Sequence, residues 1–415
     1  MSGGAAESRP AGPVAAFAHR AEHFRPSPVR AVFEHAMRPG IVSLAGGNPD
    51  TGVLPHEVLA GMTARILSER GPEVLQYGSG AGIARLTGLV CELMALGGAV
   101  ATPDRIQVTA GSQAGLDLVT KLFCDPGDVV VAEGPTYVGA LGVFGSYEVE
   151  VQHVDVDEDG VDPEAVAARI DALRTVGRTV KLVYTVPTFH NPTGVTLTEP
   201  RRRRLVEVCA QRGVPVLEDD AYGLLGFDRA HRLPSLYSLD PGAVIHLGSF
   251  SKIFSPALRL GWIAAEPSVR ARLQIAAEAV TIHPSVLSQE LAVEYVGSEH
   301  WRPALDRAAA RYRARCAAMM EALETYMPAG VRWTRPCGGF FTWLDLDPDA
   351  DHGDLMHRGL EHGVALVPGG ACYADGRPST SLRLAFSAAS EAEIAEGVRR
   401  VGEMLRDGVR RRAGD

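Results

Sequence analysis

One short stretch of the sequence combines a lysine with groups that bind phosphate. The apolar run 244–247 is followed by Ser249, Ser251, Lys252 and Arg259. Two hydroxyls and an arginine, with its planar fork of donors, can hold a phosphate group. A lysine beside them can form an imine with an aldehyde. On this stretch alone, a strand followed by a polar loop with a solvated lysine is an equally good interpretation.

Polar residues follow four other apolar runs in the same way. A turn that opens a helix presents free amide protons to a phosphate, although Ser112 can equally be an ordinary N-cap. A tyrosine ring can lie on a flat heterocycle, and an asparagine offers both a donor and an acceptor. The residues are Gly111, Ser112 and Gln113 after 106–109, Tyr137 after 128–133, Asn191 after 181–186, and Asp219 with Tyr222 after 214–217.

These apolar runs alternate with segments of helical periodicity, which predicts an α/β domain with a mainly parallel sheet. Ligands of such sheets bind at the carboxyl ends of the strands, where all of the polar residues named so far are placed. From Pro267 to about Tyr326 the pattern is helical, with a break near 283–284. The strand-like runs 337–344, 365–367 and 381–386 and a helix over 391–406 then predict a smaller α+β lobe.

Arg383 lies within one of these later strands, between two leucines. Because an arginine is unusual in a half-buried strand, we expect it to have a carboxylate partner. A surface arginine on an edge strand is the alternative.

Composition narrows the classes of function. The net charge of −9 over 415 residues disfavours nucleic-acid binding, and the run 201–204 of four arginines predicts a solvated helix face. The six cysteines have neither CxxC nor metal-ligand spacing, which predicts no metal site and small core residues in a reducing compartment. No apolar stretch approaches the roughly 18 residues of a membrane span, and the N-terminus lacks a basic region followed by an apolar one, so we expect a cytoplasmic protein.

The ordered set of motifs resembles the fold-type I aminotransferases that depend on pyridoxal phosphate, of the class I/II group. The resemblance runs from about Phe24 to Arg406 and is greatest to the 2-aminoadipate/kynurenine aminotransferase branch. Each motif is weak alone, but their order is specific. The matching stretches are Ser43–Gly47, Gln76–Tyr77, Gly111–Gln113, Pro135–Tyr137, Asn191–Gly194, Asp219–Tyr222, Ser249–Lys252 with Arg259, and Arg383.

The resemblance implies a role for each residue. Lys252 is expected to bind the cofactor covalently and to move the substrate proton, and Asp219 to face the pyridine nitrogen. Asn191 and Tyr222 are expected at the phenolic oxygen, with Tyr137 stacked on the ring. The phosphate site is expected to consist of Gly111, Ser112, Gln113, Ser249, Ser251 and Arg259, completed by Tyr77 of a partner subunit. The substrate carboxylate is expected at Gly47, Asn191 and Arg383, and the substrate side chain at Arg30.

The resemblance also implies an architecture like that of aspartate aminotransferase, with a seven-stranded type of sheet in the large domain. We expect residues 1–16 to be a disordered arm. Residues 17–54 are expected to close over the active site and to join the small domain. Residues 55–285 are expected to form the large, cofactor-binding domain and residues 286–415 the C-terminal small domain.

The implied activity is transfer of an amino group between an L-amino acid and a 2-oxo acid by a ping-pong mechanism in a homodimer. Glutamate and 2-oxoglutarate are the expected common pair, and the other substrate is 2-aminoadipate, an aromatic amino acid or an unusual amino acid of specialised metabolism. Asn48 and His190 depart from the pattern of the branch, and Arg30 can equally face solvent, so the side-chain preference stays open.

Three other classes compete with this reading. An oxidase, cyclase or lyase on the same pyridoxal phosphate scaffold would use the same lysine and aspartate. A serine acyl-enzyme would match Ser249-x-x-Lys252, but the chain lacks Ser-Asp-Asn and Lys-Thr-Gly. A transcriptional regulator would need a DNA-binding module, and only about forty residues precede Gly46–Gly47.

Overall fold

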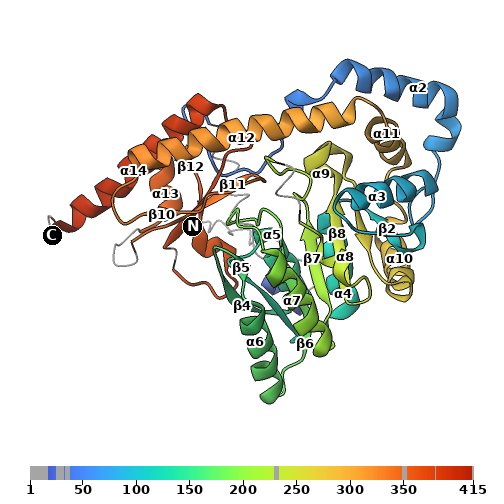
Figure 1. Cartoon of the computed structure of the whole chain (residues 1–415), viewed down its shortest axis with the longest axis horizontal. Coiled ribbons are helices and arrows are strands. Elements are labelled where there is room, and N and C mark those ends of the chain that lie inside the picture. Colours follow the sequence, from blue (N-terminus) through green and yellow to red (C-terminus); the bar gives the residue numbers. More distant parts are fainter. Residues whose placement is uncertain are drawn as a thin grey trace, which may run out of the picture.

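The structure, a computed structural model, describes residues 17–24, 32, 38–228, 233–347, 353–378 and 380–413. Its large lobe is built on an eight-stranded sheet (Figure 1). In spatial order the strands are β2 (Ile106–Thr109), β9 (Gly261–Ala264), β8 (Val244–Ser249), β7 (Val216–Asp220), β6 (Val180–Thr185), β3 (Val129–Gly134), β4 (Glu150–Asp157) and β5 (Gly160–Val161). The predicted α/β fold is confirmed, and the two-residue β5 is one strand beyond the seven expected.

The sheet is parallel at its centre. β8, β7, β6, β3 and β4 run in one direction, whereas β9 is antiparallel to both of its neighbours and β5 to β4. Every residue of β3 is buried, as expected for a parallel strand covered by helices on both faces. This is why the strand appears in the sequence as a continuous apolar run.

Alternate residues of the strands feed two buried clusters, one on each face of the sheet. One cluster contains Leu182 and Leu217 with side chains of α4, α5 and α10. The other contains Val183 and Val216 with side chains of α3, α6 and α7. The helices of this lobe are α2 (His56–Val74), α3 (Ala84–Leu96), α4 (Ser112–Phe123), α5 (Val138–Ser146), α6 (Pro163–Thr175), α7 (Glu199–Gln211), α8 (Leu236–Leu239), α9 (Phe250–Ile253), α10 (Pro267–Thr281) and α11 (Val286–Val296).

The smaller lobe has a four-stranded antiparallel sheet, in the order β10 (Arg332–Trp333), β11 (Phe341–Asp345), β14 (Ser381–Ala385) and β13 (Val367–Pro368). α13 (Leu355–Glu361) and α14 (Glu391–Ala413) belong to it. The long α12 (Trp301–Tyr326) packs along α14 and also reaches α11 of the large lobe (Figure 1). A single rigid helix therefore touches both lobes.

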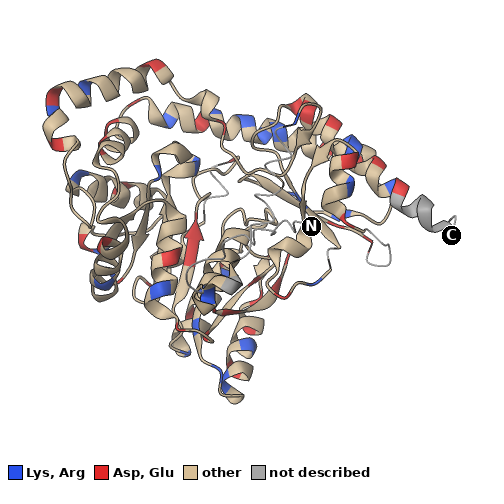
Figure 2. Cartoon of the chain, turned by 180° about the vertical axis from the view of Figure 1, so that it is seen from behind, with Lys and Arg blue, Asp and Glu red and all other residues tan. Residues whose placement is uncertain are grey.

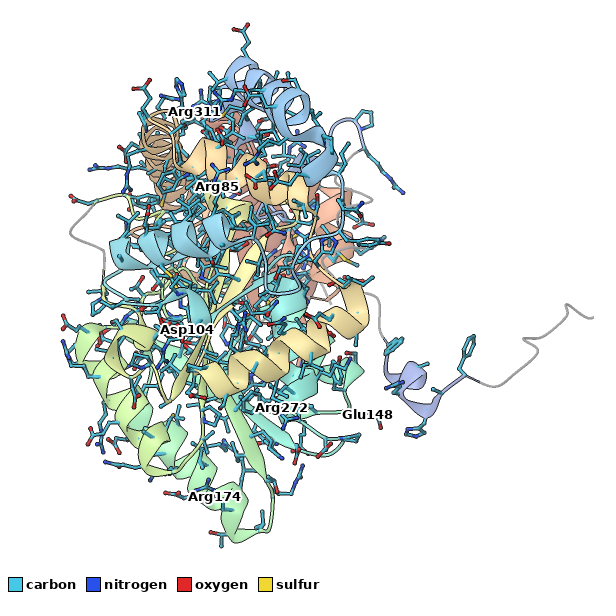
Figure 3. The ribbon with its side chains drawn as sticks, turned by 90° about the vertical axis from the view of Figure 1, so that its right-hand side faces the viewer. Arg85, Asp104, Glu148, Arg174, Arg272 and Arg311 are labelled. Carbon is cyan, nitrogen blue, oxygen red and sulfur yellow. The ribbon has the colours of Figure 1, made fainter. Side chains whose placement is uncertain are left out.

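The N-terminal segment is attached to the small lobe, because β1 (Val42–Ser43) pairs in parallel with β12 (Val364–Ala365). Before it, η1 (His19–His23) lies against α5, with His19 Nδ1 3.4 Å from a carboxylate oxygen of Glu148. Figure 3 labels Glu148. Short 3₁₀ turns complete the chain at η2 (Thr51–Val53), η3 (Pro103–Arg105), η5 (Pro256–Leu258) and η6 (Gly369–Cys372). The expected domain boundaries and closure remain predictions.

The arginine run on α7 is not the uniformly solvated face that we expected. Arg201, Arg203 and Arg204 form surface ion pairs, but Arg202 is fully buried. Its guanidinium donates to the carbonyl oxygens of Leu197 and Pro187 and to a side-chain oxygen nearby, which satisfies the buried charge. Elsewhere residues of both signs are interspersed along the outer helices (Figure 2). Within the described ranges, no helix combines the length and apolarity that would cross a membrane.

Candidate active site

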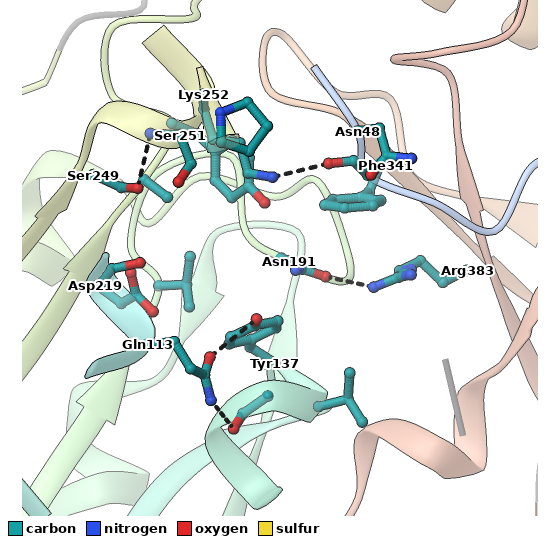
Figure 4. Close-up of a pocket in the computed structure, with 18 of the residues that line it drawn as sticks. Asn48, Gln113, Tyr137, Asn191, Asp219, Ser249, Ser251, Lys252, Phe341 and Arg383 are labelled. Carbon is teal, nitrogen blue, oxygen red and sulfur yellow. Dashed lines mark hydrogen bonds between the residues drawn. The ribbon is translucent and has the colours of Figure 1, made fainter. Parts of the chain in front are cut away.

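A cavity of about 480 Å³ lies between the carboxyl ends of the parallel strands and the small lobe (Figure 4). Its lining brings together twelve of the predicted residues: Gly47, Ser112, Gln113, Tyr137, Asn191, Asp219, Tyr222, Ser249, Ser251, Lys252, Arg259 and Arg383. Asn48 and Phe341 line it as well. The twelve predicted residues come from seven separate stretches of the sequence and line one cavity.

Lys252 lies on α9, a single turn that begins directly after β8. Its first turn is capped by Ser249, whose Oγ accepts a hydrogen bond of 3.1 Å from the Ser251 amide. The amine donates to the Gly47 carbonyl oxygen at 2.9 Å. Burial, together with the charges of Arg383 and Arg259, lowers the pKa of Lys252 to about 8. A lysine in this state supplies a neutral, nucleophilic amine near neutral pH.

Asp219 lies near the end of β7 and faces the cavity from the sheet. Its carboxylate accepts a hydrogen bond of 2.9 Å from the hydroxyl of Tyr184 on β6. Burial raises the pKa of Asp219 to about 6. Among the described residues no cation forms an ion pair with this carboxylate, so a protonated nitrogen placed in the cavity would supply the missing partner.

The predicted phosphate end is shaped by two backbone conformations. Gly111, directly before α4, has φ +89°, and a Cβ there would lie 2.5 Å from Nη2 of Arg259. Only glycine therefore lets this arginine close over the turn. Arg259 itself is left-handed, at φ 50°, and Nη2 donates to Ala110 O at 3.3 Å. The guanidinium, the Ser249 and Ser251 hydroxyls and the first amides of α4 thereby surround one corner of the cavity.

Arg383 forms the opposite end. It is buried on β14, donates to Asn191 Oδ1 at 3.0 Å and to Ala45 O at 2.7 Å, and lies 4.5 Å from the centre of the Phe341 ring. The expected carboxylate partner is not among these contacts, all of which are neutral. An asparagine and a carbonyl take up two of its donors, and a carboxylate partner for Arg383 stays a prediction. Nε remains unpaired and buried, and a ligand carboxylate can share the charge.

Tyrosines and an asparagine occupy the space between these ends. The Tyr137 hydroxyl donates to Gln113 Oε1 at 3.3 Å, and Gln113 Nε2 donates to Gly139 O at 2.9 Å (Figure 4). The Tyr222 hydroxyl is hydrogen-bonded to the Asn191 side chain, and burial raises its pKa. The rings and the amide thereby form one polar wall.

Gly111, Tyr77 and His190 are not in the cavity lining. Tyr77 is 76% exposed on the surface, with the ring of His283 edge-on to it at 5.7 Å. His190 is buried behind the cavity rather than in its wall. Arg30 lies outside the described residues.

Sequence reasoning missed Tyr184 and Phe341. Both lie inside apolar runs, where a ring is ordinarily a core residue. Phe341 is tied to the site by Gly47, since a Cβ on Gly47 would lie 2.4 Å from the ring. The adjacent glycines at 46–47 were the available signal for a close approach.

The sequence profile described as aminotransferase class I and II matches residues 39–401 of the chain. The chain belongs to this family. It is 35% identical over 397 residues to aromatic-amino-acid aminotransferase 1 of Thermococcus litoralis, covering 95% of each protein. It is 38% identical over 396 residues to 2-aminoadipate transaminase of Thermus thermophilus, covering 94% of this chain and 96% of that protein.

The solved structures agree with this assignment. The crystal structure of Pyrococcus horikoshii kynurenine aminotransferase with pyridoxamine phosphate superposes with a TM-score of 0.89 at 36% identity, covering 94% of this chain and 97% of the other. This chain is therefore an aminotransferase that depends on pyridoxal phosphate and belongs to the 2-aminoadipate/kynurenine branch.

The residues of this aminotransferase fit that cofactor. The buried Asp219 has no cationic partner among the described residues, and Gly111 leaves room for Arg259 to close over an anion. The Lys252 amine faces the same cavity. A protonated ring nitrogen, a phosphate and an aldehyde are the three groups that these sites require.

Proposed function

We propose that this aminotransferase carries an amino group from an L-amino acid to a 2-oxo acid by a ping-pong mechanism, with glutamate and 2-oxoglutarate as one pair. The observation that supports the proposal is that Lys252, Asp219 and Arg383 line a single cavity. Lys252 supplies one amine and Arg383 one buried guanidinium. Two carboxylate substrates that both need these groups must therefore use the site in turn. That order of events is ping-pong kinetics.

Pyridoxal phosphate, when bound, supplies an aldehyde for the substrate amine and a ring that accepts electrons. The residues of the chain would then divide the remaining work. Arg383 and Asn191 would hold the substrate carboxylate, and Lys252 would take the proton from the substrate α-carbon. Asp219 would keep the ring nitrogen protonated, while Asn191 and Tyr222 would bind the phenolic oxygen. Ser249, Ser251 and Arg259 would keep the phosphate in place.

The experiment is a half-reaction. The holoenzyme is mixed with one amino acid, without oxygen and without any 2-oxo acid, and products are counted against active sites. We expect about one 2-oxo acid for each site, and glutamate once 2-oxoglutarate is added. Ammonia or carbon dioxide in place of that product would instead support a lyase or cyclase, and hydrogen peroxide formed in a parallel reaction that contains oxygen would support an oxidase.

For the second substrate we propose 2-aminoadipate, an aromatic amino acid or an unusual amino acid of specialised metabolism. Support comes from the names of the relatives and from a cavity wall that contains Asn48, Val138, Pro256 and Phe341. The proposed contact of Arg30 with the substrate side chain is tested by screening amino donors with Arg30→Ala. Loss of acidic and polar donors alone would support it, whereas an unchanged profile would place Arg30 at the surface.

We further propose a cytoplasmic homodimer in which Tyr77 completes the phosphate site of the partner subunit. Tyr77 contacts His283, which follows α10, and both α10 and the segment after α2 carry exposed apolar residues, which favours a protein interface. Gly78, next to it, packs against His283 and Val286. The exposed apolar residues are Leu75, Tyr77, Ile275, Val280 and Ile282.

A further inference from the structure

Behind the cavity, a buried ion pair holds the loop that carries Asn191. His190 and Glu133 are each 3% exposed, and Nε2 of His190 lies 3.1 Å from Oε2 of Glu133. Among the described residues this nitrogen has no well-aligned hydrogen-bond acceptor, and the contact is an ion pair when the imidazole is protonated. Its strength therefore depends on charge as well as on position.

The carboxylate of this pair is fixed to the sheet. Glu133 lies near the end of β3 and accepts hydrogen bonds of 2.8 Å from Thr185 Oγ1 and from the Val186 amide of the neighbouring chain segment. Burial raises the pKa of Glu133, but the charge of His190 and these donors outweigh it, and the net pKa is lowered. Glu133 is thus an ionised anchor on a strand whose residues are all buried.

The histidine, in turn, organises its own loop. Its Nδ1 lies 2.7 Å from Thr193 Oγ1, its amide donates to Val195 O at 2.8 Å, and its carbonyl accepts from the Gly194 amide at 2.6 Å. The buried Arg202 holds the earlier part of the loop through Pro187 O at 2.7 Å. The loop is therefore fastened on both sides of Asn191.

From this loop the contacts continue into the small lobe. Asn191 Oδ1 accepts from Arg383 at 3.0 Å, and Thr193 O accepts from Thr334 Oγ1 at 2.6 Å. A displacement of His190 would consequently move the asparagine and change the support of the arginine that faces the ligand.

We propose that His190, held by Glu133, is a positioning residue that sets Asn191 and, through it, Arg383 for the substrate carboxylate. It does not read the substrate side chain, since it lies outside the cavity lining. The inference rests on the proposed role of Asn191 in carboxylate binding.

The test compares His190→Ala, His190→Gln and Glu133→Gln in the holoenzyme, with KM and kcat measured for one amino donor. His190→Ala should raise KM by about 10-fold to 100-fold, the range expected when a binding group is misplaced by about 1 Å. His190→Gln keeps the volume and should show a smaller rise. Because the two residues act as one unit, the rise in KM of the double variant Glu133→Gln/His190→Gln should be smaller than the product of the rises in the two single variants.

Thr185→Val is the matched control. It removes a hydrogen bond from the same buried carboxylate but does not touch the loop. It should lower the thermal midpoint while KM stays within about twofold, because buried hydrogen bonds contribute to stability at any position. Equal changes of KM in Thr185→Val and His190→Gln would reduce the pair to a structural contact and overturn the inference.

Asn191→Ala separates this inference from the proposed function. A wild-type KM in Asn191→Ala would remove the role of Asn191 itself. A raised KM in Asn191→Ala with an unchanged KM in both His190 variants would overturn the inference alone. If His190→Ala does not fold, His190→Gln and Glu133→Gln decide the question by the same comparison.

Discussion

At the scale of single residues, burial shifts the pKa values of two residues of the site in opposite directions. Burial disfavours charge, so it lowers the pKa of Lys252 and raises that of Asp219. Neutral amine is what covalent attachment of the cofactor requires. The raised pKa of the carboxyl, in contrast, means that a cation in the cavity would have to stabilise its ionised form.

The first prediction follows for the apoenzyme. With a pKa of about 8, Lys252 is about 10% neutral at pH 7, against about 0.03% for an ordinary lysine. The rate at which the apoenzyme attaches pyridoxal phosphate should therefore rise with pH and level off above about 8, followed by visible absorbance. A rate still rising steeply at pH 10 would contradict the lowered pKa, and Lys252→Ala should show no attachment at any pH.

The second prediction concerns Asp219→Asn. A neutral amide cannot form an ion pair with a protonated ring nitrogen, so the half-reaction should slow by about 100-fold or more, while the cofactor remains attached through Lys252. Stopped-flow measurement of the half-reaction tests this. The neighbouring Asp220 lines a different cavity, behind the sheet, and its oxygen accepts from the Gly223 amide. Asp220→Asn is thus the control, expected to stay within about threefold.

At the scale of elements, α12 fixes the loop that carries Gly47. Asp50 accepts from Arg311 at 3.1 Å and from Arg315 at 3.0 Å, and its amide donates to the Tyr312 hydroxyl at 2.8 Å. Burial raises the pKa of Asp50, but the two arginines and the Gly52 amide together outweigh it, and the net pKa is lowered. One turn of a long helix thereby sets a loop of the active site.

The third prediction is that Arg315→Met loosens this loop. Arg315 is largely buried and also donates to Ser387 O at 2.6 Å, so its loss should raise KM for the amino donor about fivefold or more, equivalent to ~1 kcal/mol. Arg311→Met is the control, because half of that side chain is exposed and an exposed ion pair contributes little. Steady-state kinetics would refute the idea if both variants behaved alike.

The elements themselves were largely predictable. Strands such as β3 are continuous apolar runs, and the break between α10 and α11 was marked by Pro284. Arg202 was wrongly predicted to be solvated, because a run of four identical residues does not itself show which of them lies on the buried face of the helix. It lies at helical spacing with Leu205, Val206 and Cys209, all buried, which was the overlooked signal.

The candidate site was predictable where a polar residue follows a strand, as at Asn191 and Ser249. It was not predictable where a contact joins strands that are far apart in the sequence but adjacent in the sheet. Glu133 and His190 meet because β3 and β6 are neighbours, and Tyr184 meets Asp219 because β6 and β7 are. Strand order of this kind is a property of the sheet, and no local pattern contains it.

At the scale of the whole molecule, the proposed dimer gives the fourth prediction. If Tyr77 serves the partner's site, Lys252→Ala and Tyr77→Ala should each be impaired, but mixed and reassociated subunits should recover activity. Hybrid dimers have one site with both residues intact, so random pairing should restore about a quarter of the wild-type rate. Absence of recovery, with hybrids demonstrated by mass spectrometry, would place Tyr77 outside the site.

The hydrogen bond from Lys252 to Gly47 joins the two lobes. Lys252 follows a strand of the large sheet, whereas the segment just before Gly47 is bonded to the small lobe through Leu44 and Ala385. Covalent use of this nitrogen would leave it with fewer protons to donate to the Gly47 carbonyl. We therefore expect attachment of the cofactor to weaken this link between the large sheet and the segment bonded to the small lobe.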